Sequence, residues 1–469
     1  MENNYAGRQL KDIQNEVQER YKADSWPWIL GYSGGKDSTA LVQIVWDSLA
    51  KLNKEELFKP IYILSSDTLV EIPKVINHIE LNLEKMSDAA VRQGLPIKPV
   101  KVYPHITNTF WVNLIGKGYP APTNNFRWCT DRLKINPTSE FIRSQAFESS
   151  GAILLLGSRK SESSARKKRI EAHKISGKKF NPHPEIPTAH VYLLIEDWET
   201  EEVWDYLLDH PSPWGADNRD LVYMYKNAND GECPLILDIK TPSCGKSRFG
   251  CWCCTVVKNE KALSSLIEHG EKWLSPLQKL REILLLTQDQ DKKKMFREHV
   301  KRNGQALFIR GKLKEEGIKE LARGPYTMEF RKYFLRSLLQ TEKELNNNNP
   351  HKNSKYINLI EERELHEIQR LWKEEKNDWE NSVYAIYKEV YEKGIDGAND
   401  RFGFLTAEDK AAILRICDEE GFPAELAMEL LTTAQYHLGL RSKIQLKNKV
   451  AKVFKKEWRS EAEIYRDIK

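Results

Sequence analysis

The sequence contains no long apolar segment. None of its 469 residues belongs to an uninterrupted apolar run of about 18, the length that a transmembrane helix requires. Residues 1–20 are polar with a helical pattern, and they lack the apolar core of a signal peptide. We therefore expect a cytoplasmic protein with no membrane partner.

A strong net charge is also missing, since 73 basic and 68 acidic residues leave only +5. The distribution of charge is uneven, however. Residues 159–179 hold nine Lys or Arg against two acids, and residues 441–459 hold eight against one. Each stretch fits either a polyanionic partner, bound with release of counterions, or an ordinary solvated surface.

Cysteine is scarce over most of the chain. Of seven cysteines, five lie within the 22 residues 233–254, while Cys129 and Cys417 stand apart. In a chain without a secretion signal, such clustering favours metal binding or redox chemistry over structural disulfides.

The first 210 residues alternate short apolar runs with amphipathic stretches. We predict strands at 28–32, 61–65, 97–102 and 152–156, and helices at 38–52, 73–93 and 137–147. Apolar strands without polar alternation, separated by helices, indicate a parallel sheet covered on both faces. The predicted fold class is α/β, a doubly wound parallel sheet that binds ligands at the carboxyl ends of its strands.

The remaining sequence suggests further divisions of the chain. Residues 211–258 are rich in Pro, Gly and Cys, and helical, highly charged patterns begin near residue 259. We predict an N-terminal helix (1–24), an α/β domain (25–210), a cysteine-rich segment (211–258), a charged helical region (259–345), a linker (346–353) and a C-terminal helical domain (354–469).

A glycine-rich turn follows the first predicted strand. It comprises Ser33, Gly34, Gly35, Lys36, Asp37, Ser38 and Thr39. Two glycines let backbone N–H groups approach an anion, and the following helix adds its positive end. The pattern is not a Walker A loop, because Leu30 occupies the position of the first glycine of that motif. We expect Ser33, Lys36, Ser38 and Thr39 to join the two glycines in binding phosphate.

This SGGKDS turn resembles the pyrophosphatase loop of the adenine nucleotide alpha-hydrolase superfamily, whose members cleave ATP to AMP and pyrophosphate. Three more stretches resemble the superfamily's phosphoadenylylsulfate reductase branch. They are Ser66–Glu71, Gly157–Ser163 with Arg166, and Asp197-Trp198 with Val203-Trp204. The resemblance implies ATP as the nucleotide and a Mg²⁺ ion beside it.

Five charged residues in these stretches are candidates for the nucleotide site. Asp67 and Glu71 would hold Mg²⁺ or orient the ribose, and Arg159 and Arg166 would bind phosphate in a bidentate manner. Asp37 would bind Mg²⁺ or polarise the attacking group. The sequence leaves these alternatives open.

The clustered cysteines have the spacing of a metal site. Cys233, Cys244, Cys251 and Cys254 form the pattern C-x10-C-x6-C-x2-C, with Cys253 inside the last pair. Four thiolates bind either Zn²⁺ or a [4Fe–4S] cluster. A zinc ribbon normally has two tight C-x-x-C pairs, so the loose spacing favours the cluster without excluding zinc.

A closer resemblance joins these stretches. The segments Phe126–Pro137, Gly231–Pro234, Pro242–Val257, Phe308–Gly317 and Gly324–Arg331 are similar to DndC, the sulfurtransferase family of bacterial DNA phosphorothioate modification. The resemblance spans residues 25–340 and fades beyond residue 346. It implies that Cys233, Cys244, Cys251 and Cys254 bind the cluster, although Cys253 stands where the family pattern has Thr.

Cys129 lies between basic side chains, with Arg127 and Arg132 nearby in the sequence. Neighbouring cations lower the pKa of a thiol and favour the reactive thiolate. Cys129 is therefore a candidate persulfide carrier, a substitute cluster ligand or an inert structural thiol.

The DndC resemblance implies an ATP-dependent sulfurtransferase that acts on DNA, with Asp37, Lys36 and Cys129 in catalytic roles. The implied partners are DNA, a cysteine desulfurase, and the DndD and DndE proteins. Three alternatives stay open: a reductase of phosphoadenylylsulfate or adenylylsulfate, a tRNA-thiolating enzyme, and a zinc-stabilised DNA-binding subunit.

Overall fold

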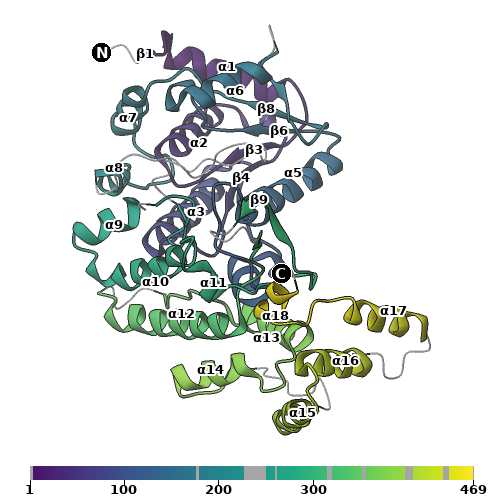
Figure 1. The fold of residues 1–469 in the computed structure, drawn as a ribbon. Helices are drawn as coiled ribbons and strands as arrows, with labels where there is room; N and C mark the ends of the chain where they lie inside the picture. Colours follow the sequence, from purple (N-terminus) through teal and green to yellow (C-terminus); the bar gives the residue numbers. More distant parts are fainter. Residues whose placement is uncertain are drawn as a thin grey trace. The chain divides into compact units, whose positions relative to one another are not determined.

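The computed structural model describes residues 4–175, 179–226, 250–258, 261–313, 319–350, 355–396, 405–436 and 443–467 (Figure 1). The chain divides into two compact units. An α/β unit comprises residues 1–105 and 122–278, and a helical unit comprises residues 106–121 and 279–469. The finer domain boundaries proposed from the sequence stay predictions.

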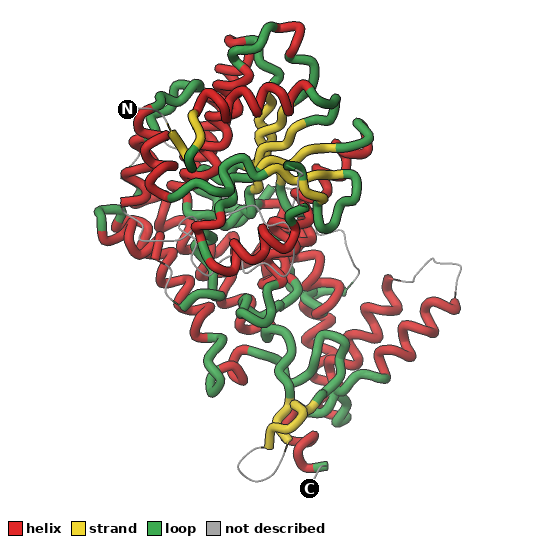
Figure 2. The backbone as a smooth tube through the Cα atoms, turned by 90° about the horizontal axis from the view of Figure 1, so that it is seen from above, coloured by secondary structure: helices red, strands yellow, loops and turns green. Residues whose placement is uncertain are grey.

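The α/β unit is built on a six-stranded sheet in the order β5-β4-β3-β6-β8-β7 (Figure 2). Its strands are β3 (Trp28–Gly31), β4 (Ile61–Ser66), β5 (Ile97–Val102), β6 (Ala152–Leu155), β7 (Asn181–Pro182) and β8 (Ala189–Tyr192). Five strands are parallel, and the edge strand β7 runs antiparallel to β8. The predicted fold class is confirmed, and the four predicted strands agree with the structure to within one residue at each end.

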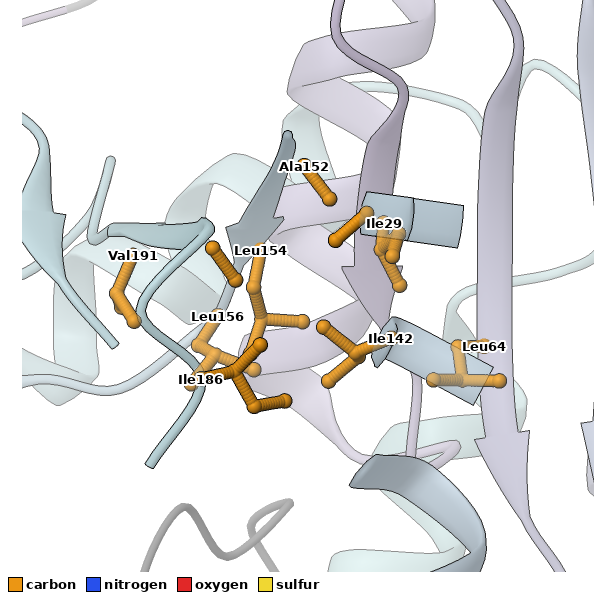
Figure 3. Close-up of a cluster of buried hydrophobic side chains, with 10 residues drawn as sticks. Ile29, Leu64, Ile142, Ala152, Leu154, Leu156, Ile186 and Val191 are labelled. Atoms are coloured by element: carbon orange, nitrogen blue, oxygen red, sulfur yellow. The ribbon is translucent and has the colours of Figure 1, made fainter. Parts of the chain in front are cut away.

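Helices precede, separate and follow the strands of this unit. They are α1 (Leu10–Lys22), α2 (Lys36–Leu49), α3 (Pro73–Gln93), α4 (Trp128–Thr130), α5 (Asn136–Glu148), α6 (Ser164–His173), α7 (Thr200–Asp209), α8 (Arg219–Lys226) and α9 (Lys261–Glu268). On one sheet face, Ile142 of α5 packs into a buried cluster with Ile29, Leu64 and Leu154 (Figure 3). Trp28 and Leu30 alternate with Ile29 along β3 and are also buried, so both faces of this strand are covered.

The strand order places a topological switch point beside β3. The chain passes from β3 to β4 and β5 on one side, then returns to β6 and β8 on the other. In open parallel sheets, ligands bind at the carboxyl ends of the two strands where this reversal occurs. The expected binding crevice therefore lies after Gly31 of β3 and after Leu155 of β6.

The helical unit contains the remaining elements. The helix α10 (Ser275–Leu286) crosses its boundary, and α11 (Lys293–Phe296), β9 (Phe308–Leu313), β10 (Lys319–Leu321), α12 (Met328–Asn348), α13 (Glu362–Lys376), α14 (Ser382–Tyr391), α15 (Ala407–Glu419), α16 (Ala424–Tyr436), α17 (Lys443–Phe454) and α18 (Glu461–Arg466) follow. The helix α12 thus includes residues 346–348 of the proposed linker. In the described ranges, no helix is both long and apolar enough to cross a membrane.

Residues 106–121 are fixed within the helical unit by a buried arginine. Arg331 of α12 is 2 % exposed, and its guanidinium donates to the carbonyl oxygens of Gly116 at 3.0 Å and Tyr326 at 2.8 Å. The indole N–H of Trp372 donates to the carbonyl of Ile115 at 2.9 Å. These bonds to backbone oxygens satisfy polar groups that would otherwise be buried without partners.

Candidate functional site

The predicted nucleotide loop connects β3 to α2 at the switch point. Gly34 has a φ of +72°, in the left-handed region that favours glycine. A Cβ atom at this position would also lie 2.6 Å from Cγ1 of Ile79 in α3. Backbone geometry and packing therefore both require glycine here, and the turn brings the loop amides to the start of α2.

Three hydroxyl side chains of the loop are engaged within the loop itself. Ser38 Oγ donates to the carbonyl of Gly35 at 2.9 Å and accepts from the backbone N–H of Ser33 at 3.2 Å. Thr39 Oγ1 donates to the same carbonyl at 2.9 Å, and the hydroxyls of Ser33 and Ser38 lie 3.2 Å apart. In this structure, the hydroxyls that the sequence suggests as phosphate ligands stabilise the turn.

Asp37 is held between two cations at the start of α2. Arg159, which follows β6, donates from Nε to Asp37 Oδ1 at 2.6 Å. Lys36 Nζ lies 2.7 Å from Asp37 Oδ2, and Lys36 is 2 % exposed. The ion pair between Asp37 and Arg159 joins the ends of β3 and β6, so it spans the switch point of the sheet.

The guanidinium of Arg159 is fully buried and bonded on every nitrogen. Its Nη1 donates to Ser161 Oγ at 2.8 Å and to the Trp198 carbonyl at 3.1 Å, and its Nη2 donates to Thr200 Oγ1 at 3.3 Å. With this set of partners, Arg159 acts on the site by fixing the carboxylate of Asp37. The sequence motif identified the residue, but its buried environment could not be read from the motif.

Gly157 explains how β6 approaches the loop so closely. A Cβ atom on Gly157 would lie 2.7 Å from the carbonyl oxygen of Asp37 and 3.0 Å from the backbone nitrogen of Ser38. Both are backbone atoms of the first turn of α2, so they cannot move aside without displacing the helix. The glycine of the GSRKSES stretch is therefore required by close packing.

The predicted carboxylates after β4 form a separate hydrogen-bonded turn. Asp67 Oδ1 accepts from the N–H of Leu69 at 2.9 Å, and Asp67 Oδ2 lies 3.0 Å from Lys101 Nζ. Glu71 accepts from the backbone N–H of Thr68 at 3.1 Å and from its hydroxyl at 2.6 Å. Burial, reinforced by the charge of Asp67, raises the pKa of Glu71 to about 7.

Leu69 occupies this turn with a φ of +66°. An L-residue with a branched side chain adopts this left-handed conformation at a cost of about 1–2 kcal/mol. The turn therefore depends on its hydrogen bonds to Asp67 and Glu71, and it positions both carboxylates where the strand ends.

Arg166 is placed elsewhere by the structure. It pairs with Glu162 across one turn, where α6 begins. Arg166 is therefore part of a local ion pair on α6, whereas Arg159 bonds directly to Asp37.

The cysteine segment packs against the turn after β4. Cys251 forms an isolated antiparallel bridge with Glu71, and the backbone N–H of Trp252 donates to the carbonyl of Val70 at 3.1 Å. Cys251 Sγ lies 3.6 Å from Thr68 Oγ1. The C-x-x-C pair is thereby positioned beside the carboxyl end of β4, within the same unit as the nucleotide loop.

The thiols in this segment differ in their exposure. Cys253 is fully buried, whereas Cys251, Cys254 and Cys129 are partly exposed. Burial raises the pKa of Cys253 well above its ordinary value, and the nearby thiols of Cys251, Cys254 and Cys129 add to this effect. The backbone N–H of Cys254 donates to the Cys251 carbonyl at 3.0 Å, a tight turn that suits a pair of metal ligands.

Of the four cysteines predicted to bind the cluster, the structure describes Cys251 and Cys254. Cys233 and Cys244 lie outside the described residues. Among the side chains within the described ranges, no three His, Cys, Asp or Glu converge as a metal site. By their chemistry, Cys251 and Cys254 could offer soft sulfur ligands to iron or zinc, and Asp67 and Glu71 could offer oxygen ligands to Mg²⁺.

Two residues of the site carry no recognisable sequence signal. Lys101, at the end of β5, lies 2.8 Å from Glu80 as well as close to Asp67. Tyr225 of α8 accepts a hydrogen bond from the backbone N–H of Lys36 at 3.0 Å. A single lysine in a strand and a tyrosine about 190 positions from the loop gain their roles only through folding.

Comparisons with known proteins agree with this geometry at the level of the domain. Residues 27–257 match the sequence family described as "Phosphoadenosine phosphosulfate reductase domain". An uncharacterised protein of Methanocaldococcus jannaschii is 28% identical over 200 residues, which are 42% of this chain and 35% of that protein. The chain thus spans about a third of the length of this curated relative.

Two solved structures show more distant similarity. The FMN adenylyltransferase of Candida glabrata, in complex with FAD and inorganic pyrophosphate, is 14% identical, with 43% of this chain and 58% of that chain covered and a TM-score of 0.25. The U34-tRNA thiolase NcsA of Methanococcus maripaludis, with its [4Fe-4S] cluster, is 12% identical, with coverages of 61% and 84% and a TM-score of 0.27. Neither likeness is close enough to support a functional conclusion.

Proposed function

We propose that the chain, whose residues 27–257 match the phosphoadenosine phosphosulfate reductase domain family, is an ATP-dependent sulfurtransferase of the adenine nucleotide alpha-hydrolase superfamily that acts in DNA phosphorothioate modification. The observation that carries the proposal is the pairing of Asp37 with Arg159 across the switch point, directly beside the SGGKDS turn. This arrangement places a fixed carboxylate and the amides of a helix N-terminus where a nucleotide binds in such sheets.

The proposed reaction begins with attack on ATP by a non-bridging oxygen of a DNA phosphodiester. The oxygen bonds to the α-phosphorus, the bond to the β-phosphate breaks, and pyrophosphate leaves. The outer sulfur of a persulfide then attacks the activated DNA phosphorus, and AMP departs with the original oxygen. A thiol reductant cleaves the remaining S–S bond, which leaves the phosphorothioate and the free cysteine. Oxide is not a usable leaving group, whereas AMP is, which is why the reaction needs ATP.

The loop residues would contribute positioning and charge. The amides of Gly34, Gly35 and Lys36 lie at or just before the start of α2, where negative charge on the departing pyrophosphate would be stabilised. Asp37, held by Lys36 and Arg159, would keep one fixed orientation toward Mg²⁺ or the attacking group. Pre-orientation of this kind lowers the barrier without any movement of the protein during the reaction.

Within the basic stretch 159–179, we propose that only some of the cations contact DNA. Four of its cations join Arg159 in ion pairs with acids: Lys160 with Asp197, Arg166 with Glu162, Lys174 with Glu196 and Lys179 with Glu16. Lys178 lies outside the described residues. Lys167, Lys168 and Arg169 on α6 form no ion pair within the described part of the chain, so they are the proposed phosphate contacts.

The helical unit offers a second basic surface. The helix α17 exposes Lys447, Lys449 and Lys452, and Lys455 is exposed just after the helix ends. None of these four lysines pairs with an acid in the described ranges. Such a surface suits the phosphate backbone through counterion release. We propose that it also contacts DNA.

Sulfur would reach the acceptor through the cysteine-rich segment. Cys251 and Cys254, with Cys233 and Cys244, would hold a [4Fe–4S] cluster, which would supply redox chemistry beside the nucleotide loop. Cys129, whose thiol acts electrostatically on Cys253, would carry a persulfide delivered by a cysteine desulfurase. DndD and DndE would be further partners of the complex.

A small-molecule reductase fits the structure less well. The related reductases use an accessible cysteine late in the chain. Cys417 of α15 is 6 % exposed, which does not suit a nucleophile that must meet substrate.

Mass spectrometry of nuclease-digested DNA tests the proposed acceptor. DNA incubated with the purified chain, Mg-ATP, a desulfurase and cysteine should yield phosphorothioate dinucleotides after digestion. DNA incubated with the Asp37→Ala variant under the same conditions should yield none. Sulfur found in tRNA but not in DNA would contradict the proposal and support a tRNA-thiolating enzyme.

A further inference from the structure

A tyrosine hydroxyl lies on the amide face of the proposed phosphate loop. The backbone N–H of Lys36 donates to Tyr225 Oη at 3.0 Å. The same oxygen would lie 3.0 Å from a Cβ atom placed on Gly35. The side chain of Tyr225 thus fills the space that the absence of a side chain on Gly35 leaves open.

Packing on α7 fixes the position of this phenol. The ring of Tyr225 lies 5.0 Å from that of Trp204, with the two planes at 86°, which is a favourable edge-to-face arrangement. The Tyr225 side chain is buried, and Lys36 Nζ lies 5.7 Å from its ring centroid. Tyr225 therefore contacts both the amide and the ammonium group of Lys36.

A phenolic oxygen and a phosphate oxygen are the same kind of hydrogen-bond acceptor. Amides at the N-terminus of a helix after a glycine turn are the groups that bind phosphate in such loops. One N–H group makes one full-strength hydrogen bond, so Tyr225 Oη and a phosphate oxygen would compete for the amide of Lys36.

We propose that Tyr225 is an internal competitor for the phosphate site, whose hydroxyl occupies the position of a pyrophosphate oxygen and leaves when nucleotide binds. The inference rests on the proposed function only in taking the SGGKDS turn as a phosphate site. It goes further in assigning to α8 a residue that limits nucleotide affinity.

Calorimetric titration of the full chain with inorganic pyrophosphate, and separately with ATP and Mg²⁺, tests this competition. Tyr225→Phe keeps the ring and removes the competing acceptor, so both ligands should bind about fivefold more tightly, the equivalent of one net hydrogen bond. Tyr223→Phe is the matched control, because Tyr223 lies on the same helix and is 64 % exposed. It should leave both affinities unchanged.

A spectroscopic signal separates displacement from a passive structural role. Because the ring of Tyr225 packs on Trp204, pyrophosphate binding should change the fluorescence of Trp204. The ligand-induced change should be smaller in Trp204→Phe than in the unmodified chain. Tyr225→Leu removes the ring as well as the hydroxyl, and it should also bind pyrophosphate more tightly. This second variant tests the proposal if Tyr225→Phe does not fold.

The outcomes distinguish this inference from the proposed function. Equal or weaker pyrophosphate binding by both Tyr225 variants, with normal binding by the unmodified chain, overturns the role of Tyr225 alone. Failure of the unmodified chain to bind either ligand overturns both the inference and the proposed function.

Discussion

Arg159 Nε lies 2.6 Å from Asp37 Oδ1, and this contact joins two loops that are 122 positions apart in the sequence. The loops follow β3 and β6, neighbouring strands between which the order of the sheet reverses. The ion pair therefore fixes the carboxylate of Asp37 at the carboxyl ends of β3 and β6, which is where ligands bind in sheets of this kind.

Arg159→Lys should lower the rate of pyrophosphate release from Mg-ATP in the presence of DNA by about 100-fold, because a small displacement of a catalytic group has an effect of this size. Lysine keeps the charge but cannot donate to Asp37, Ser161 and Trp198 at once. Initial rates with saturating ATP give the measurement. Arg92→Lys, on the exposed surface of α3, is the control and should retain full activity. An Arg159→Lys enzyme of normal rate would contradict the positioning role.

Gly157→Ala should destabilise the α/β unit by about 1–3 kcal/mol, because the added Cβ would overlap backbone atoms of Asp37 and Ser38. Urea unfolding measures the loss. Gly394→Ala is a matched control, since no atom lies within 4 Å of a Cβ at that position. Equal stabilities of the two variants would show that β6 and α2 can separate without cost.

The buried side chain of His183 should make stability depend on pH. Its Nδ1 accepts from the backbone N–H groups of Glu185 and Ile186, both at 3.1 Å. Burial, with a smaller effect of the Arg143 charge, lowers the pKa of His183 from 6.5 to about 4. Between these values the unfolded chain binds the proton and the folded chain does not.

The contribution of neutral His183 to the free energy of unfolding should therefore be fully present above pH 6.5. It should decline by about 3 kcal/mol in total as the pH falls toward 4. Urea unfolding at several pH values checks this decline. His183→Gln, which cannot take up a proton in this range, should show a shallower dependence on pH. Parallel curves for the two proteins would contradict the burial of a neutral imidazole.

Substitution of single cysteines should distinguish the proposed metal ligands, Cys251 and Cys254, from the buried thiol of Cys253. Cys251→Ser and Cys254→Ser should lose bound iron and absorbance at about 400 nm, because these partly exposed cysteines are the proposed ligands. Cys253→Ala should retain both signals, since its thiol is fully buried. Iron and sulfide assays provide the measurement. Bound zinc without this absorbance would indicate a structural zinc site instead.

Much of the α/β unit was predictable because its strands are short, apolar and separated by long amphipathic helices. The strand β5 and the helix α3 have the bounds predicted from the sequence. The strand β8 was missed, since AHVY is too short to stand out as an apolar run. Its strand character comes from pairing with β6 rather than from its own residues.

The residues of the site could be predicted from the sequence, but the contacts between them could not. The motifs identified Asp37 and Arg159 separately, yet only the sheet order brings them into contact. Local sequence also gave no sign that Leu69 adopts a positive φ, because glycine is the usual residue in that conformation. Tyr225 contacts the loop through tertiary packing alone, and no local pattern encodes such a contact.

The central claim is that the SGGKDS turn directs cleavage between the α and β phosphates of ATP. Chromatography of the products formed by the purified chain with Mg-ATP, DNA, a cysteine desulfurase, cysteine and a thiol reductant tests it most directly. AMP and pyrophosphate should accumulate in equal amounts, and Asp37→Asn should abolish both. Formation of ADP and inorganic phosphate would contradict the account.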